Sequence, residues 1–267
     1  MAKSTLPNRK NRTGRRSPLA SIALITIGLL TTGGAYALFT TTATADTTAA
    51  HSQLVDEGSK LFAANCATCH GLDLEGADSG PSLIGVGAAS VEFQVATGRM
   101  PLAQSGPQAE EKPVQFTDEQ IEALYTYVAA QAPGPGIPAE EYLQADGDAA
   151  LGAELFRINC AMCHNVAGAG GALTEGKFAP ALSDVSAQHV YEAMVTGPQN
   201  MPVFNDNNIS PEDKANIITY LNYLDETPAV GGLTLGNLGP VSEGLFIWIF
   251  GLGSIVAITI WLTAKSN

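Results

Sequence analysis

A duplication in the middle of the chain restricts most strongly how this sequence can fold. The stretch from Gly58 to His70 matches the stretch from Gly152 to His164, at an offset of 94 positions. Eight residues recur in register, in the order Gly, Leu, Phe, Asn, Cys, Ala, Cys and His. An internal repeat of this kind predicts two copies of one small folded unit.

The similarity continues beyond the cysteines. The matching positions are Pro81 with Pro180, Met100-Pro101 with Met201-Pro202, and Tyr127 with Tyr220. We call residues 51–132 the first repeat and residues 147–226 the second repeat. Each has about 80 residues, which is small for a hydrophobic core without added support. We therefore expect a bound group in the middle of each repeat.

Each repeat is predicted to begin and end with a helix. Apolar residues at helical spacing precede Cys66 and Cys160. The closing helix of the first repeat starts with a capping box, Thr117 with Gln120. Its counterpart starts at Ser210, with proline in the first helical position.

The cysteines define the chemistry. All four belong to two C-x-x-C-H motifs, formed by Cys66, Cys69 and His70 and by Cys160, Cys163 and His164. This motif is typical of c-type haem attachment. Each cysteine would form a thioether with one porphyrin vinyl group, and the histidine would ligate the iron. The sequence therefore predicts two covalently bound haem c groups.

Three other interpretations of the cysteines are less favoured. A single zinc site made from both C-x-x-C pairs would merge two copies that each look complete. A disulfide framework does not require histidine after the second cysteine. A thioredoxin-type pair expects a βαβ context, whereas helices are predicted here.

Methionines supply the expected sixth iron ligands. Met100 and Met201 stand in matching Met-Pro contexts, so the predicted axial pairs are His70 with Met100 and His164 with Met201. Such pairs raise the reduction potential and occupy both axial positions, which suits electron transfer. Core packing is the alternative role for each methionine. Met162 lies inside an attachment motif, and Met194 is expected to pack in a helix.

Several other residues near the motifs have an expected role. The carbonyl of Pro81 or Pro180 could accept a hydrogen bond from the axial histidine, or the prolines simply form turns. Arg99 and Lys177 are candidates to contact haem propionates. His51 and His189 are expected on exposed segments, without a role.

Two uncharged apolar runs flank the repeats, at 19–39 and 245–263. Each is long enough to span a bilayer as a helix. The first follows a basic stretch and precedes an A-x-A sequence at 43–45, as in a signal peptide. Its length exceeds the usual apolar region of a signal, so an uncleaved anchor is preferred.

Charge is distributed very unevenly. The chain has 13 basic and 26 acidic residues, and all the acidic ones lie between Asp46 and Glu243. Nucleic acid is therefore excluded as a partner. The acidity either keeps the domains soluble or forms a docking surface for a basic partner. Basic residues lie before the first apolar run and after the second. They predict that both termini are in the cytoplasm and that the repeats are outside.

Each repeat resembles a class I cytochrome c domain, with a helix leading into C-x-x-C-H, a Met-Pro loop and a closing helix. The whole arrangement resembles the dihaem cytochrome c subunit of the actinobacterial bc-type quinol–cytochrome c oxidoreductase. The resemblance implies an all-α fold, two tandem class I cytochrome c domains plus one or two transmembrane helices. It also implies cytochrome b, a Rieske iron–sulfur subunit and a cytochrome c oxidase as partners, in the plasma membrane.

The implied role is electron transfer from quinol, through the iron–sulfur protein and two haems, to the oxidase. The chain would act as the electron-transfer subunit of an enzyme complex, without catalytic residues or turnover of its own. The alternatives are a dihaem subunit of a cbb-type oxidase or alcohol dehydrogenase, and a dihaem peroxidase. A peroxidase needs an open axial position, which Met100 and Met201 argue against.

These observations predict nine segments. They are a basic cytoplasmic N-terminus (1–18), a transmembrane anchor or signal (19–39), a tether (40–50), cytochrome c domain 1 (51–132), a Pro/Gly linker (133–146), cytochrome c domain 2 (147–226), a second linker (227–244), a transmembrane helix (245–263) and a cytoplasmic tail (264–267).

Overall fold

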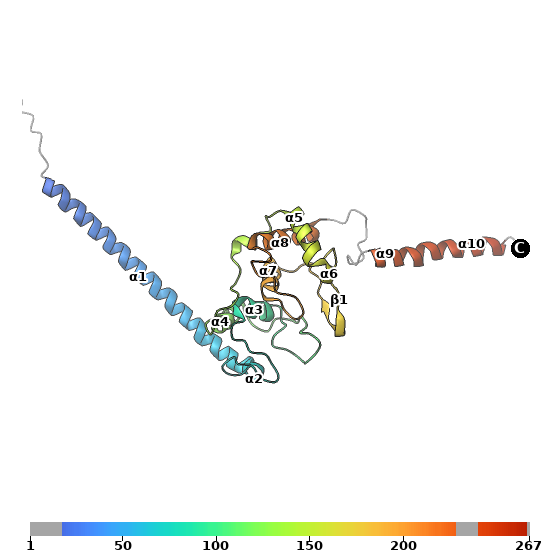
Figure 1. Ribbon diagram of the computed structural model, residues 1–267, viewed down its shortest axis with the longest axis horizontal. Coiled ribbons are helices and arrows are strands. Elements are labelled where there is room, and N and C mark those ends of the chain that lie inside the picture. Colours follow the sequence, from blue (N-terminus) through green and yellow to red (C-terminus); the bar gives the residue numbers. More distant parts are fainter. Residues whose placement is uncertain (1–17, 228–239, 266–267) are drawn as a thin grey trace, which may run out of the picture. The chain divides into compact units, whose positions relative to one another are not determined.

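Helices dominate the computed structural model, which describes residues 18–227 and 240–265 (Figure 1). Within those ranges, the one sheet is an antiparallel pair that joins Gly171 to Ala179 and Ala172 to Phe178. The helices are α1 (Pro18–Asn65), α2 (Ala67–His70), α3 (Gly87–Ala96), α4 (Asp118–Ala129), α5 (Ala149–Asn159), α6 (Ala161–His164), α7 (Ala187–Thr196), α8 (Pro211–Glu226), α9 (Pro240–Phe246) and α10 (Gly253–Lys265). Shorter elements are the 3-10 turns η1 (Glu140–Tyr142) and η2 (Thr174–Gly176), the π-helical turn η4 (Ile247–Leu252), and the strands β1 (Gly171–Ala172) and β2 (Phe178–Ala179).

The chain divides after Gln53 into two compact parts. The N-terminal part contains the apolar portion of α1. That helix continues through residues 40–50, where the composition predicts a tether. No glycine or proline interrupts this stretch. Its alanines favour a helix, and its threonines lower the helix propensity only slightly.

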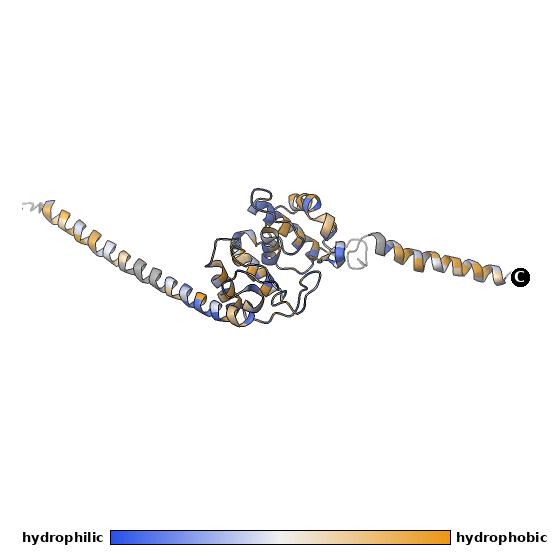
Figure 2. Cartoon of the chain, turned by 60° about the horizontal axis from the view of Figure 1, so that its bottom comes forward, coloured by the Kyte–Doolittle hydropathy of each residue, from blue (hydrophilic) through white to orange (hydrophobic). Residues whose placement is uncertain are grey.

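Among the residues that the structure describes, two helical segments are long and apolar enough to cross a membrane, Pro18–Ala37 and Glu243–Lys265. Neither is buried against the rest of the structure. Their hydrophobic residues give the orange colour in Figure 2. They coincide with the runs predicted to span the bilayer. Most of the basic N-terminus and of the 227–244 linker falls outside the described residues.

The first repeat is built around the end of α1, α3 and α4. Its core contains Phe62, Leu74 and Leu124, all nearly inaccessible to water. The capping box predicted at Thr117 is confirmed, because its hydroxyl accepts from the Gln120 backbone and the Gln120 side chain accepts from the Thr117 backbone.

The second repeat packs α5 against α8 in the same way. Its core contains Phe156, Met194 and Ile217. The predicted cap at Ser210 is confirmed, since its hydroxyl accepts a hydrogen bond from the backbone N–H of Asp213. An aromatic pair joins the first and last helices of each repeat. The ring centroids of Phe62 and Tyr127 are 5.6 Å apart, and those of Phe156 and Tyr220 are 5.5 Å apart.

A glycine lets the helices approach closely in each repeat. A Cβ on Gly58 would collide with the backbone of Ala123, and one on Gly152 would collide with the backbone of Asn216. The recurrence of glycine at these two positions therefore reflects the close crossing of the first and last helices of each repeat. That crossing determines where the following C-x-x-C-H motif begins.

The linker between the repeats packs against the first repeat. The Pro135 carbonyl accepts a hydrogen bond from the Ala89 backbone at 3.1 Å. Gly87 has a positive φ and approaches the Pro135 backbone so closely that a Cβ would not fit. The start of the linker is thus held against the N-terminal turn of α3, while α3 itself packs against α7 of the second repeat.

Candidate functional site

The two C-x-x-C-H motifs adopt the same backbone. In each, the first cysteine follows the end of a helix, α1 or α5. Its N–H donates a hydrogen bond to the carbonyl of the phenylalanine four residues earlier, at 2.8 Å. A four-residue helix follows, α2 or α6, in which the histidine N–H donates to that cysteine's carbonyl at 3.0 Å. The same tight turn therefore follows the first cysteine in both repeats.

Both motif histidines are oriented by a proline carbonyl. Nδ1 of His70 lies 2.8 Å from the Pro81 oxygen, and Nδ1 of His164 lies 3.0 Å from the Pro180 oxygen. The predicted hydrogen bonds are therefore confirmed. A carbonyl can only accept, so Nδ1 carries the proton and Nε2 keeps a lone pair for a metal. Burial lowers the pKa of His164, although the bond to Pro180 opposes this shift.

The cysteines are not arranged as a thiolate metal site or a disulfide. None of the four is joined to another in a disulfide. Burial, reinforced by the neighbouring cysteine, raises the pKa of Cys66 and of Cys160 to about 11. Among the described residues, no cysteine takes part in a side-chain cluster suited to a metal. The two pairs belong to separate repeats, as two independent attachment sites require.

A cavity of about 690 Å³ opens beside the second motif. It is lined by Cys160, Cys163, His164 and Met201, so the structure brings the four predicted haem-binding residues of this repeat together. Its size falls within the range of cofactor pockets. Most of its remaining lining is apolar, including Phe156, Ile217 and Leu221. The residues present therefore fit a haem.

The other methionines of the second repeat differ from Met201 in their surroundings. Met194 is buried in the core, as expected for packing. Met162 is 93% exposed, within the attachment motif. Met201 is partly buried against the core, and its N–H donates to the Pro198 carbonyl at 3.0 Å.

The first repeat places its motif residues around one core. Cys66, Leu83 and Met100 all pack against the same buried cluster. The Met100 N–H donates to the Gln94 carbonyl at 2.8 Å, which ties the Met-Pro loop to the end of α3. Met100 and Met201 thus each pack against the core of their own repeat.

Part of the second cavity is formed by the first repeat, which sequence reasoning missed. Phe93, Thr97 and Arg99 contribute to its lining. The Arg99 side chain is only 12% exposed, lies 4.9 Å from the Phe93 ring centroid and reaches Glu111 at 3.8 Å. Burial lowers the pKa of Arg99, with Glu111 opposing the shift. Arg99 therefore faces the cavity of the other repeat.

Lys177 lies close to the second Met-Pro loop. Its Nζ donates to Asn200 Oδ1 at 3.1 Å, next to Met201, and lies 3.7 Å from Glu175. The side chain is largely buried at 23% exposure. Lys177 is therefore close to the second Met-Pro loop, but it is not among the residues that line the cavity.

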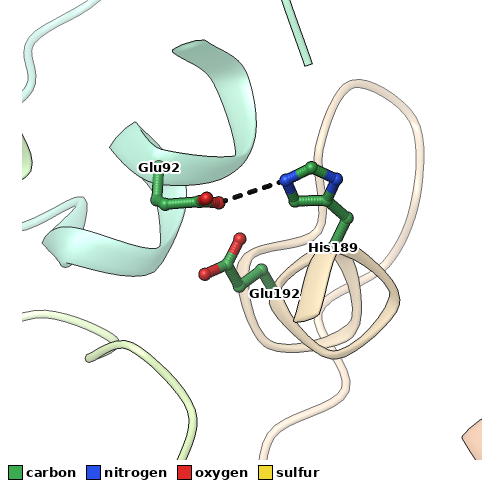
Figure 3. A group of neighbouring side chains, drawn as sticks. All are labelled: Glu92, His189 and Glu192. Atoms are coloured by element: carbon green, nitrogen blue, oxygen red, sulfur yellow. Dashed lines mark ion pairs between the residues drawn. The ribbon is translucent and has the colours of Figure 1, made fainter. Parts of the chain in front are cut away.

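The expectation for His189 was wrong. Its side chain is 22% exposed, and its Nε2 lies 3.5 Å from the Glu92 carboxylate of the first repeat (Figure 3). The helical pattern around His189 indicated a surface helix, but α3 covers that face. A contact between two repeats leaves no periodic signal within either one.

Comparison with known families identifies the class of protein. A model described as "Cytochrome c" matches residues 55–132, and one described as "Cytochrome C oxidase, cbb3-type, subunit III" matches residues 147–221. The fold and the motifs thus define a tandem c-type cytochrome, whose domains imply covalently bound haem c. The predicted all-α class with two cytochrome c domains is confirmed.

Similar proteins identify the family. Cytochrome bc1 complex cytochrome c subunits are 43% identical in Corynebacterium efficiens, over 99% of this chain and 95% of the relative, and 42% identical in Mycobacterium tuberculosis, over 97% and 96%. The relative in Corynebacterium diphtheriae is 44% identical, over 80% of this chain and 82% of its own length. The chain belongs to the family of cytochrome bc1 complex cytochrome c subunits. This membership and its two apolar helices indicate a membrane location.

Proposed function

We propose that the chain binds two haem c groups and uses them to carry electrons through a respiratory complex. Cys66, Cys69, Cys160 and Cys163 would attach the haems. His70 with Met100 and His164 with Met201 would ligate the two irons. The observation that carries this proposal is the duplicated histidine–proline hydrogen bond, because it prepares the same metal-binding nitrogen in both repeats.

The route of the electrons is inferred from the family. The haem supplies one-electron redox chemistry, and methionine ligation keeps its potential high. Electrons would come from a quinol-oxidising bc-type complex, through its Rieske iron–sulfur subunit and beside cytochrome b, and leave to a cytochrome c oxidase. The chain itself positions the haems, excludes water from them and performs no turnover alone.

The membrane topology follows from charge. Helices Pro18–Ala37 and Glu243–Lys265 would both cross the plasma membrane, with the basic N-terminus and Lys265 inside. The acidic cytochrome domains, at 51–132 and 147–226, would then lie outside the cytoplasm. If the first helix were cleaved as a signal, the orientation of the domains would be unchanged.

A pyridine haemochrome spectrum with haem counted per polypeptide tests the proposal. Two c-type haems per chain are expected in protein matured by a competent host. Alanine at Cys163 should reduce the count in the second repeat alone, and alanine at Cys69 should do so in the first. A count of zero or one in the unmodified protein would refute the dihaem assignment.

A second candidate function has one specific observation in its favour. The second repeat matches the model described as "Cytochrome C oxidase, cbb3-type, subunit III". The chain could therefore serve as the dihaem subunit of a cbb-type oxidase. Affinity purification from membranes separates the two: cytochrome b and an iron–sulfur subunit support the first function, whereas a copper–haem oxidase catalytic subunit without them supports the second.

A further inference from the structure

Three potential metal ligands meet where the two repeats pack together, at the edge of the second cavity, which His189 also lines. Glu92 comes from α3 of the first repeat, and His189 and Glu192 come from α7 of the second (Figure 3). One ligand atom of each lies within 4.8 Å of the other two. Among them, His189 Nε2 lies 3.5 Å from Glu92 Oε2.

Burial makes this cluster unusual. Glu192 is completely buried, and Glu92 is 13% exposed. Gln188 donates to Oε1 of Glu192 at 3.0 Å, but Oε2 of Glu192 has no hydrogen-bond partner. Oε2 of Glu92 also has no hydrogen-bond partner. Buried polar atoms are nearly always hydrogen-bonded in folded proteins. Two buried carboxylate oxygens without a hydrogen-bond partner therefore indicate that a proton or a cation belongs between them.

Burial and the proximity of Glu92 to Glu192 disfavour two ionised carboxylates in this cluster. Burial raises the pKa of Glu192 to about 10, and the nearby Glu92 adds to this. Burial also raises the pKa of Glu92, but the nearby His189 and Glu192 outweigh this effect and leave the pKa lowered. Burial raises the pKa of Tyr125 on α4, and the charges of Glu122, Glu92 and Glu192 raise it further. The cluster therefore holds a proton unless a cation takes its place.

We propose that Glu92, His189 and Glu192 form a binding site for a divalent transition-metal ion, Zn²⁺ in the first instance. Imidazole with carboxylates is a ligand set that zinc accepts, whereas Ca²⁺ and Mg²⁺ prefer oxygen ligands. Tetrahedral zinc with bonds of about 2.05 Å separates its ligands by about 3.4 Å, close to the 3.5 Å between His189 and Glu92. A small side-chain rotation of Glu192 would complete the site, with water as the fourth ligand.

The proposed ion would join the two repeats. Its ligands lie on α3 and α7, the helices through which the repeats pack. Phe93, the neighbour of Glu92, contacts the His189 ring at 6.0 Å and also lines the second cavity. Zn²⁺ would therefore fix the wall that the first repeat contributes to the cavity of the second. This proposal does not depend on the path of the electrons.

Zinc titration of the full-length haem-loaded protein tests the proposal. The protein is stripped with a chelator, and ZnCl₂ binding is measured by competition with a zinc-sensitive dye. One tight site per chain is expected. His189→Ala or Glu192→Gln should weaken it at least about 100-fold, more than the 10–100-fold typical of losing an outer-shell partner. Hydrogen exchange in α3 and α7 should slow when zinc binds.

Matched controls separate this site from incidental binding. His51→Ala removes an exposed histidine on α1, and Glu122→Gln removes an exposed glutamate on α4. Both should leave zinc binding unchanged. An unaltered haem spectrum verifies that each variant is folded. If Glu192→Gln does not fold, Glu92→Gln replaces it in the titration. The proposal is wrong if the unmodified protein has no tight site, or if His189→Ala binds zinc as tightly as His51→Ala does.

Discussion

Replacing Gly152 by alanine should destabilise the second repeat, although alanine favours helix. The new Cβ would overlap the backbone oxygen of Asn216 and lie 3.0 Å from the Cβ of Tyr220. Helix propensity favours the change by about 1 kcal/mol. Overpacking costs about 3 kcal/mol when the obstacle is backbone that cannot rotate away. The net loss is therefore about 2 kcal/mol.

A loss of this size is easily measured. For a domain of 60–100 residues, about 2 kcal/mol corresponds to a decrease in Tm of about 8–16 °C. Thermal unfolding followed by circular dichroism, and by the haem absorbance of the second repeat, provides the assay. Gly58→Ala should produce a similar loss in the first repeat, because its Cβ would collide with Ala123.

Gly136→Ala is the control, since a Cβ there meets no atom within 4 Å. Its Tm should stay close to that of the unmodified protein. If Gly152→Ala melts at or above the unmodified protein, helix propensity outweighs the close crossing of α5 and α8. The close crossing would then be refuted as the reason why glycine recurs at this position.

Three further predictions concern the haem sites and the cluster between the repeats. Met100→His should lower the reduction potential of the first haem, and Met201→His should lower that of the second, because histidine lacks the potential-raising effect of methionine. Redox titration with each haem resolved checks this. An unchanged potential would exclude that methionine as the iron ligand. Arg99→Gln should lower the potential of the second haem more than that of the first, because the charge lies in the second cavity; the same titration tests it, and the opposite order would contradict it. Glu192 is protonated when folded but ionises near 4.5 when unfolded. With zinc chelated, stability should therefore fall as pH rises from about 4.5 toward about 10, and fall less in Glu192→Gln; urea unfolding at several pH values measures this, and equal slopes would contradict it.

The sequence predicted well what recurs within each repeat. The motif histidines, the proline carbonyls and the two helix caps depend on residues close in the chain, and the duplication identified each of them twice. The Gly, Phe and Tyr that recur at matching positions lie in the structure at the crossing of the first and last helices of each copy. Local spacing was sufficient because the elements involved are connected by short turns.

What escaped prediction lies between the repeats. Arg99 is far in sequence from the cavity it lines, and His189 is paired with a residue 97 positions earlier. Such contacts depend on how two finished domains dock, which no spacing within either domain encodes. The helical course of residues 40–50 was missed for another reason. Threonine-rich composition suggests a loose segment, although nothing there breaks a helix.

The shared cavity wall affects the order in which the protein can mature. Residues of the first repeat line the cavity of the second repeat. The core cluster of the first repeat, in contrast, contains only residues of the first repeat. Synthesis at about 5–20 residues per second releases the first repeat roughly 5–20 s before the second, given their offset of 94 positions. The finished first repeat can then serve as a template against which the second closes. Biogenesis in chain order thus supplies the shared wall before the repeat that depends on it.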